Sequence, residues 1–231
     1  MVVLGALLWL CSAVLRVGGQ LVAAAAWETP YSWDQDLLSH LGNTDCGLFL
    51  ESHGPPQFVC SPLYALLNTA LVLAGLGIIG GALLLRRLWP GGWAGGTAYV
   101  LMLTTGVLEA LTGLVPENIS RTVHLIAALH LPIGGIAIFL VSLAIVDQAR
   151  WISAFGYLVA GVTVIASMLF SAGQYSVPVL YFGLGAGAME RLASYPFTLW
   201  LLVIGLILCT GPGRAGCRAC SRSDAADPRA A

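Results

Sequence analysis

Long apolar segments dominate the pattern of hydrophobic and polar positions along the chain. Six of them approach or exceed the roughly 20 residues that a helix needs to cross a bilayer, and they do not alternate as the strands of a membrane β-barrel do. Helices also satisfy their backbone hydrogen bonds within one segment, as lipid requires. The pattern therefore predicts an all-α, polytopic membrane protein, a bundle of six transmembrane helices at residues 2–26, 62–85, 93–115, 123–146, 151–171 and 192–210.

The connections between the predicted spans indicate how the bundle is organised. The segment "PENISR" joins the third span to the fourth, and "DQAR" joins the fourth to the fifth. Links as short as these place consecutive helices side by side and antiparallel. We therefore expect one transmembrane domain at residues 1–210, with a long loop at residues 27–61. The remaining residues, 211–231, are rich in Arg, Ala, Ser, Asp and Pro, and we expect a disordered tail there.

The composition supports a membrane protein and also indicates the kind of organism that it comes from. Charged residues make up 9% of the chain, whereas a soluble domain has about 25%, and the mean hydropathy is +0.87. All ten basic residues are arginine. This usage is typical of a GC-rich genome, so we expect a bacterial protein.

The distribution of arginine predicts the orientation in the membrane. Seven of the ten arginines fall on one side of the predicted spans, and the positive-inside rule assigns that side to the cytoplasm. We expect a multi-pass protein of the cell membrane with a cytoplasmic C-terminus and an extracytoplasmic loop at residues 27–61. The first span also has features of a signal peptide, with small residues before Trp27. It lacks a positively charged start and Arg16 interrupts it, so we favour a retained helix.

The extracytoplasmic loop carries an unusually polar stretch, "DLLSHLGNTDCGLFLESHGPPQFVCSPL". Cys46 and Cys60 both lie in it, and two cysteines on the oxidising side of a membrane predict a disulfide bond. Upstream, "SWDQDLLSHLG" has the signature of a short helix, with Ser32 as N-cap, Gln35 completing a capping box and Gly42 at the C-terminal stop.

That short helix would place Trp33, Leu37 and Leu41 on one face. The face would then pack on the bundle or lie at the lipid interface. We interpret the loop as a lid over the outer mouth of the bundle. An ordered loop without a function of its own is the alternative.

Polar side chains inside the predicted spans form a second feature. Ionisable groups in a bilayer cost on the order of 2.5–3.5 kcal/mol each, so they need partners. Those of this chain lie in the half of the bundle nearest the loop, and we expect them to converge on an outward-facing polar pocket, with an arginine at its rim able to meet an anionic lipid head group. The pocket candidates are Asn68, Glu109, His124, His130, Glu190 and Arg191.

The two histidines raise the question of a metal. His124 and His130 are six residues apart, about 240° around a helix, so they do not share a face as the two histidines of an HxxxH pair would. Histidines that form hydrogen bonds between helices are favoured over a zinc site, and we predict no metal. The chain has no Walker loop, no GxGxxG after a strand and no GxSxG elbow, so we expect no cofactor and assign no catalytic residue.

Four short motifs resemble those of a bacterial and archaeal six-helix family, the domain of unknown function 998 family, which is placed near the Frag1/DRAM/Sfk1 membrane proteins. They are "SHLGN", "CSPLYALLN", "PEN" followed by "VH", and "GAMERLASYPFTLW". The resemblance covers residues 2–209 and implies the fold rather than a function, because the family has no established activity. Within the loop motif, which also contains His40, it points to Ser39, Gly42 and Asn43, and within the spans it points to Asn68, His124, Glu190 and Arg191.

Three functions are compatible with these features. The first is an integral membrane protein that binds or handles lipid, or supports an envelope complex, through the polar pocket. A lipid-directed hydrolase that uses His124, His130 and Glu109, with or without a metal, is the second. A small-solute transporter is the third, although no inverted repeat is visible. We favour the first, with membrane lipids as partners and no nucleic acid; no motif names a protein partner.

Overall fold

The computed structural model describes residues 1–28, 30–49, 56–175 and 178–211. The predicted disordered tail, apart from Gly211, lies outside the described residues. Six helices are long and apolar enough to span a membrane, which confirms the predicted six-helix, multi-pass fold. The fourth span, Arg121–Ala144, consists of two helices. The helices are α1 (Val2–Ala25), α2 (Tyr64–Leu84), α3 (Gly92–Leu114), α4 (Arg121–Ala128), α5 (His130–Ala144), α6 (Arg150–Tyr175) and α7 (Ala186–Thr210).

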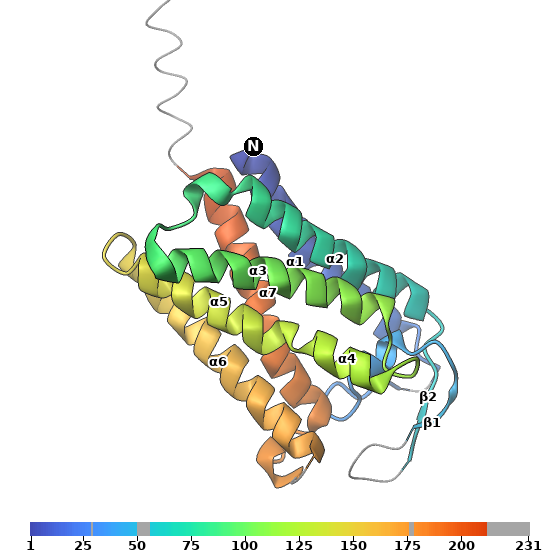
Figure 1. Ribbon diagram of the computed structural model, residues 1–231. Coiled ribbons are helices and arrows are strands. Elements are labelled where there is room, and N and C mark those ends of the chain that lie inside the picture. Colours follow the sequence, from blue (N-terminus) through green and yellow to red (C-terminus); the bar gives the residue numbers. More distant parts are fainter. Residues whose placement is uncertain (29, 50–55, 176–177, 212–231) are drawn as a thin grey trace, which may run out of the picture.

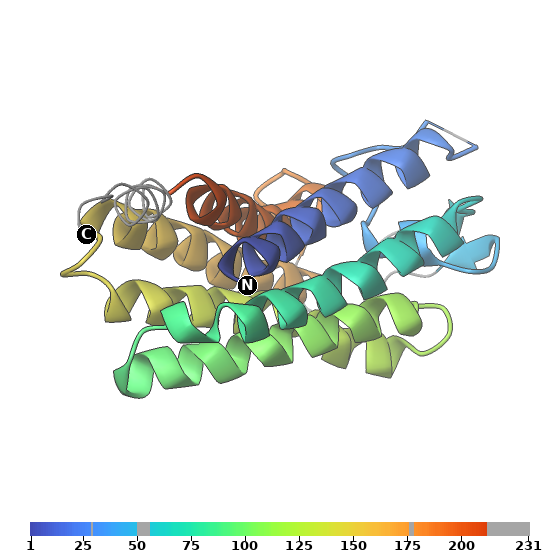
Figure 2. The same cartoon turned by 90° about the horizontal axis from the view of Figure 1, so that it is seen from above.

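The helices pack mainly in sequence order. α1 packs on α2, α2 on α3, α3 on α5 and α5 on α6, while α7 packs on α1 and α6 (Figures 1 and 2). The loop between α1 and α2 lies at the end of the bundle opposite to the N-terminus (Figure 1). We call this the loop end. α4 lies there and packs mainly on α3.

The break between α4 and α5 follows from a proline. Pro132 has no backbone N–H, so the carbonyl group of Ala128, four residues earlier, cannot take part in a regular helical hydrogen bond. α4 ends at Ala128, and the Leu129 amide instead bonds to the Ile126 carbonyl at 3.2 Å, a 3-10 pattern. The break places His130 at the first position of α5.

Close contact between α2 and α3 depends on glycine. A Cβ atom added to Gly75 would lie 2.5 Å from the Ala110 amide nitrogen and 2.5 Å from the Gly106 carbonyl oxygen. Both are backbone atoms of α3, so the helices would have to move apart.

We therefore expect Gly75→Ala to lower the free energy of unfolding by roughly 1–3 kcal/mol, the usual range for overpacking. Thermal unfolding of purified protein in detergent measures the effect. Gly96→Ala is the matched control, because Gly96 is exposed on α3 and its added Cβ would meet nothing within 4 Å. Equal stability of the two variants would show that the α2–α3 contact tolerates the methyl group.

The α1–α2 loop contains a 3-10 helix (Ser39–Gly42) and an antiparallel hairpin of β1 (Gly47–Phe49) and β2 (Gln57–Val59). The hairpin was not predicted from the sequence. A disulfide bond joins Cys46 to Cys60, which confirms the predicted bridge. The bridge closes the hairpin at its open end, directly before β1 and directly after β2.

The predicted helix at "SWDQDLLSHLG" is wrong over most of its length. Residues 33–35 form a turn, and only Ser39–Gly42 is helical. The Ser32 amide donates to the Asp36 carboxylate at 2.7 Å, and the Ser32 hydroxyl donates to Asp34 at 2.6 Å. These local bonds to side chains compete with helix formation. Leu37 is buried as expected, whereas Trp33 is exposed.

Removing the disulfide with Cys46→Ser/Cys60→Ser should destabilise the loop. The bridge closes a segment with a sequence separation of 14, for which the chain-entropy model gives about 3 kcal/mol. Thermal unfolding with and without reductant measures the loss, and Cys11→Ser, at an exposed position on α1, is the control. If the unfolding temperature of the wild-type protein were the same with and without reductant, the prediction would be wrong.

Candidate functional site

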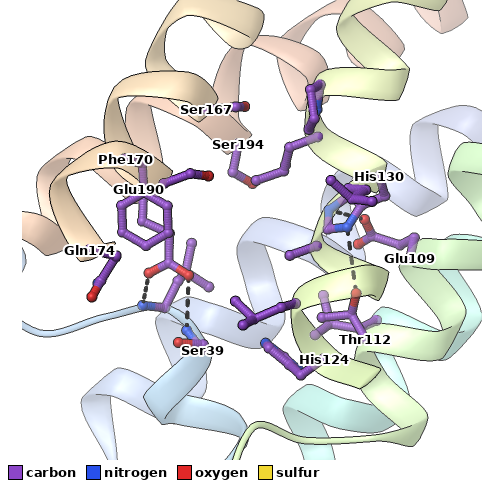
Figure 3. Close-up of a pocket in the computed structure, with 18 of the residues that line it drawn as sticks. Ser39, Glu109, Thr112, His124, His130, Ser167, Phe170, Gln174, Glu190 and Ser194 are labelled. Atoms are coloured by element: carbon purple, nitrogen blue, oxygen red, sulfur yellow. Dashed lines mark hydrogen bonds and ion pairs between the residues drawn. The ribbon is translucent and has the colours of Figure 1, made fainter. Parts of the chain in front are cut away.

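A cavity of about 140 Å³ lies inside the loop end of the bundle, beneath the α1–α2 loop. Residues of all seven α-helices and of the α1–α2 loop line it (Figure 3). We call it the charged cavity, because five of its lining residues are ionisable: Arg16, Glu109, His124, His130 and Glu190.

A buried ion pair forms one wall of the charged cavity. Arg16 of α1 donates through Nη1 to Glu109 Oε2 on α3, and His130 Nε2 lies 2.8 Å from the same oxygen. Arg16 also donates through Nε to Thr198 at 2.9 Å and through Nη2 to Ser194 at 2.8 Å, both on α7. The pair is almost completely buried, so each charge depends on the other.

Glu109 has further capacity to accept hydrogen bonds. Its Oε2 atom receives both Arg16 and His130, whereas Oε1 is buried and has no hydrogen-bond partner among the described residues. An ionised carboxylate oxygen is an acceptor only. The free oxygen therefore fits a group that donates a hydrogen bond.

The two histidines are held in different ways. His130 Nδ1 lies 3.0 Å from the Ala127 carbonyl oxygen, while Nε2 faces the Glu109 carboxylate. His124 Nδ1 lies 3.0 Å from the Val115 carbonyl oxygen and donates to it. In the neutral ring this leaves His124 Nε2 as an acceptor.

Glu190 connects the charged cavity to the loop. Its carboxylate accepts the amide hydrogens of Leu38, at 2.5 Å, and of Ser39, at 3.3 Å (Figure 3). These amides lie at the N-terminus of the 3-10 helix Ser39–Gly42, where no intrahelical acceptor is available. Glu190 thus holds the roof of the cavity while its side chain forms part of the wall.

Arg191 holds the other side of the loop. Its Nη1 donates to the carbonyl oxygens of Trp33, at 2.8 Å, and Asp36, at 3.0 Å, and Nη2 donates to the Tyr31 hydroxyl. The guanidinium also lies over the Trp33 ring, 4.9 Å from its centroid. We call Glu190, Arg191 and their loop partners the loop clasp.

Tyr31 completes the loop clasp from within the loop. Its hydroxyl lies 3.1 Å from the Asp36 carbonyl oxygen and 2.9 Å from that of Leu37, and it donates to them. Burial raises the pKa of the Tyr31 hydroxyl well above its usual value. The hydroxyl therefore keeps its proton and can donate while it accepts from Arg191.

The C-terminal end of the 3-10 helix is fixed from α2. Asn68 Nδ2 donates to the Gly42 carbonyl oxygen at 2.8 Å, and a Cβ atom on Gly42 would lie 2.6 Å from Asn68 Oδ1. His40 and Asn43 are buried within the loop and do not line the charged cavity. The loop motif is therefore held at both ends, by Glu190 and by Asn68.

The structure divides the six predicted pocket residues into two groups. Glu109, His124, His130 and Glu190 line the charged cavity, whereas Asn68 and Arg191 lie outside it and hold the loop. Arg16 lines the cavity and was not among the candidates. The sequence could have indicated Arg16, because an arginine inside an apolar span needs a buried partner.

Among the described residues, no three His, Cys, Asp or Glu side chains are grouped to hold a metal ion.

Part of the lining of the charged cavity reaches the surface of the bundle. Leu125 and Leu129, near the α4–α5 break, and Phe170, Ser171 and Gln174, on α6, line the cavity, and we call them its margin. Leu125 is 38% exposed and Leu129 is 49% exposed. Because both leucines are exposed and belong to a candidate membrane span, they lie on a surface that a bilayer would contact.

The family described as "Protein of unknown function (DUF998)" matches residues 3–207. The chain belongs to the DUF998 family. This match confirms the resemblance given by the four motifs, and it does not by itself relate the chain to the Frag1/DRAM/Sfk1 proteins. Comparison with curated proteins and with solved structures gives no significant match.

Two of the sequence motifs of this DUF998 protein are in contact in the structure. The motif "SHLGN" forms the 3-10 helix and the residue after it, and "GAMER" forms the first turns of α7. They meet in the loop clasp, where Glu190 bonds the Leu38 and Ser39 amides. These motif residues thus hold the roof of the cavity, whereas His124 and Ser194, which also belong to the motifs, line its wall.

Proposed function

We propose that this protein binds a membrane lipid by admitting the polar head group sideways into the charged cavity. The observation that carries the proposal is that exposed residues of the fourth span and of α6 line the cavity, so an opening at this margin would face the bilayer. A lipid could place its head group among polar side chains and leave its acyl chains beside Leu125 and Leu129. Neither the head group nor the chains would then lose their preferred surroundings.

The interior of the cavity supports binding over a purely structural role. Arg16 and Glu109 already neutralise each other, yet Glu109 Oε1 has no hydrogen-bond partner among the described residues. A water molecule needs about 10–15 Å³ of such space, so 140 Å³ holds several waters or a small head group. This combination of space and an unpartnered acceptor favours a ligand over residues that only satisfy one another.

The orientation completes the proposal. By the arginine distribution the C-terminus lies in the cytoplasm and the loop end faces outward, in a cell membrane, so the lipid would come from the outer leaflet. Support of an envelope complex, lipid hydrolysis and solute transport stay hypotheses, because no contact in the cavity favours one of them.

Native mass spectrometry of protein extracted in a mild detergent tests the proposal. The wild type should retain a lipid, and Ala128→Phe, which adds bulk to the wall near the opening, should lose it. Ala154→Phe is the matched control, because Ala154 is an exposed alanine of α6 that does not line the charged cavity. A wild type that carries no lipid, or equal retention in Ala128→Phe and wild type, would count against the proposal.

A further inference from the structure

We infer that a groove on the outside of the bundle, separate from the charged cavity, binds one phospholipid from the leaflet on the side of the loop end. The groove has a volume of about 820 Å³. Residues of α1, α6 and α7 line it, and α7 packs on both of the other helices. We call it the outer groove. Its lining has no described residue in common with that of the charged cavity, so the inference stands apart from the proposed function.

The outer groove presents apolar side chains to the bilayer. Val14 of α1 is 62% exposed, Leu158 of α6 is 66% exposed and Leu199 of α7 is 47% exposed. All three helices are candidate membrane spans, so hydrocarbon rather than water would meet these side chains. Either the acyl chains of a lipid or a helix of another protein has the chemistry to fill the groove.

The length of the site favours a lipid over a spanning helix. A recess of about 430 Å³ adjoins the outer groove, and Tyr195 and Pro196 line both. Together the recess and the groove follow α7 from Ala188 to Leu202, about 21 Å at a rise of 1.5 Å per residue. One leaflet with its head-group region is about 20–22 Å thick, whereas a spanning helix needs the whole hydrocarbon core of about 30 Å.

Close contact between α1 and α7 ends the outer groove beyond Leu202. A Cβ atom added to Gly205, about one turn further along α7, would lie 2.8 Å from Leu10 Cγ and 3.1 Å from the Ala6 carbonyl oxygen. Leu10 therefore packs directly on α7 at this level. An acyl chain that lies in the groove from the loop end would stop there.

The recess at the loop end suits the polar part of a lipid. Trp33 and Tyr195 line it, and side chains of these two types are enriched at membrane interfaces. Arg191 and Asp34 are its charged residues. Both carboxylate oxygens of Asp34 already accept hydrogen bonds within the loop. The arginine is therefore the charged group of the recess that lacks a partner of opposite charge.

The hydrogen bonds of Arg191 support this assignment. Among the described residues it forms no ion pair, and its hydrogen bonds go to neutral oxygen atoms, those of the Tyr31 hydroxyl and of the Trp33, Asp36 and Gly187 carbonyl groups. Its Nε atom is buried and has no hydrogen-bond partner in the same part of the chain. A buried charge is costly unless it is compensated, and arginine binds phosphate strongly. A phospholipid would supply that phosphate to the recess and its acyl chains to the outer groove.

The variant Gly18→Leu tests the inference. Gly18 lines the outer groove and its added Cβ would meet nothing within 4 Å, so leucine fills the groove without displacing a neighbour. Delipidated protein is titrated with dipalmitoyl phosphatidylglycerol, and binding is read by native mass spectrometry. We expect about tenfold weaker binding at this site than in the wild type, because the acyl chains lose their contacts in the groove. Gly161→Leu is the matched control, a half-buried glycine of α6 with equally open surroundings that does not line the groove.

The same titration in the Ala128→Phe background separates the two lipid sites. Ala128→Phe narrows the charged cavity and leaves the outer groove unchanged, so it should still bind one lipid. The double variant Ala128→Phe/Gly18→Leu should lose that lipid. Dipalmitoylglycerol, which has the same chains but no phosphate, should bind to Ala128→Phe about tenfold more weakly than the phospholipid, because it cannot pair with Arg191.

Three results would overturn the inference. The first is equal binding by the wild type, Gly18→Leu and Gly161→Leu, which would show that the outer groove holds no lipid. The second is equal binding of the phospholipid and the diacylglycerol, which would show that the phosphate is not recognised. The third is a wild-type dimer that Gly18→Leu alone dissociates, which would assign the groove to a second copy of this chain. None of these results bears on the charged cavity, whose own test is the loss of lipid in Ala128→Phe.

Discussion

Replacing Glu109 with alanine is expected to lower the free energy of unfolding by about 3–5 kcal/mol, the cost of leaving a buried charge without its partner. Arg16 is 2% exposed and Glu109 is fully buried, so water cannot replace the lost carboxylate. His130 loses its partner at the same time. Chemical or thermal unfolding in detergent micelles measures the change.

A charge-removing double variant separates the loss of pairing from a general defect. In Arg16→Met/Glu109→Leu both charges are gone, and replacing a buried pair by apolar side chains is often nearly neutral. We therefore expect this variant to recover most of the stability that Glu109→Ala loses. Glu117→Ala is the surface control, because its partner Arg121 is 3.7 Å away and 44% exposed, and it should cost less than about 1 kcal/mol. A Glu109→Ala protein as stable as the wild type would show that Arg16 finds another partner.

The spans were predictable because their signal is local. In lipid, each helix must satisfy its backbone hydrogen bonds within its own segment. A spanning helix therefore needs an uninterrupted apolar segment, which is visible directly in the sequence. The break at Leu129 was missed because the predicted span ran across it, although Pro132 marks the position. The loop was harder, because the Ser32 amide donates to Asp36 and the Ser32 hydroxyl donates to Asp34, and a sequence pattern does not show that these local bonds replace the predicted helix cap.

The cavity was predictable in part for a different reason. Depth along a span follows from counting residues, so Glu109 and His130 could be assigned to the same half of the bundle. Rotation about the helix axis and the choice of partner cannot be counted in this way. Asn68 and Arg191 have the expected depth but contact the loop, and only the three-dimensional arrangement brings Arg16 to Glu109.

Replacing Arg191 with alanine should detach the loop from α7. The variant loses the bonds to the Trp33 and Asp36 carbonyl oxygens and to the Tyr31 hydroxyl, and it leaves these acceptors inside a partly buried clasp. Since hydrogen bonds to charged groups contribute about 1.5–3 kcal/mol each and are not additive, we expect a loss on the order of 3 kcal/mol. Limited proteolysis of the loop and thermal unfolding, measured on the same samples, report detachment and stability separately.

Two further substitutions decide whether geometry or charge holds the loop. Arg191→Lys keeps the charge but not the planar fork that reaches several oxygens, so it should lose most of the effect of Arg191. Arg87→Ala, at an exposed arginine of the 3-10 helix Arg86–Leu88 after α2, should leave loop proteolysis unchanged. If Arg191→Lys protects the loop as well as the wild type does, the positive charge alone is sufficient. If the loop of Arg191→Ala also resists proteolysis as it does in the wild type, then Glu190 and the contact of Asn68 with Gly42 hold the roof of the cavity without Arg191.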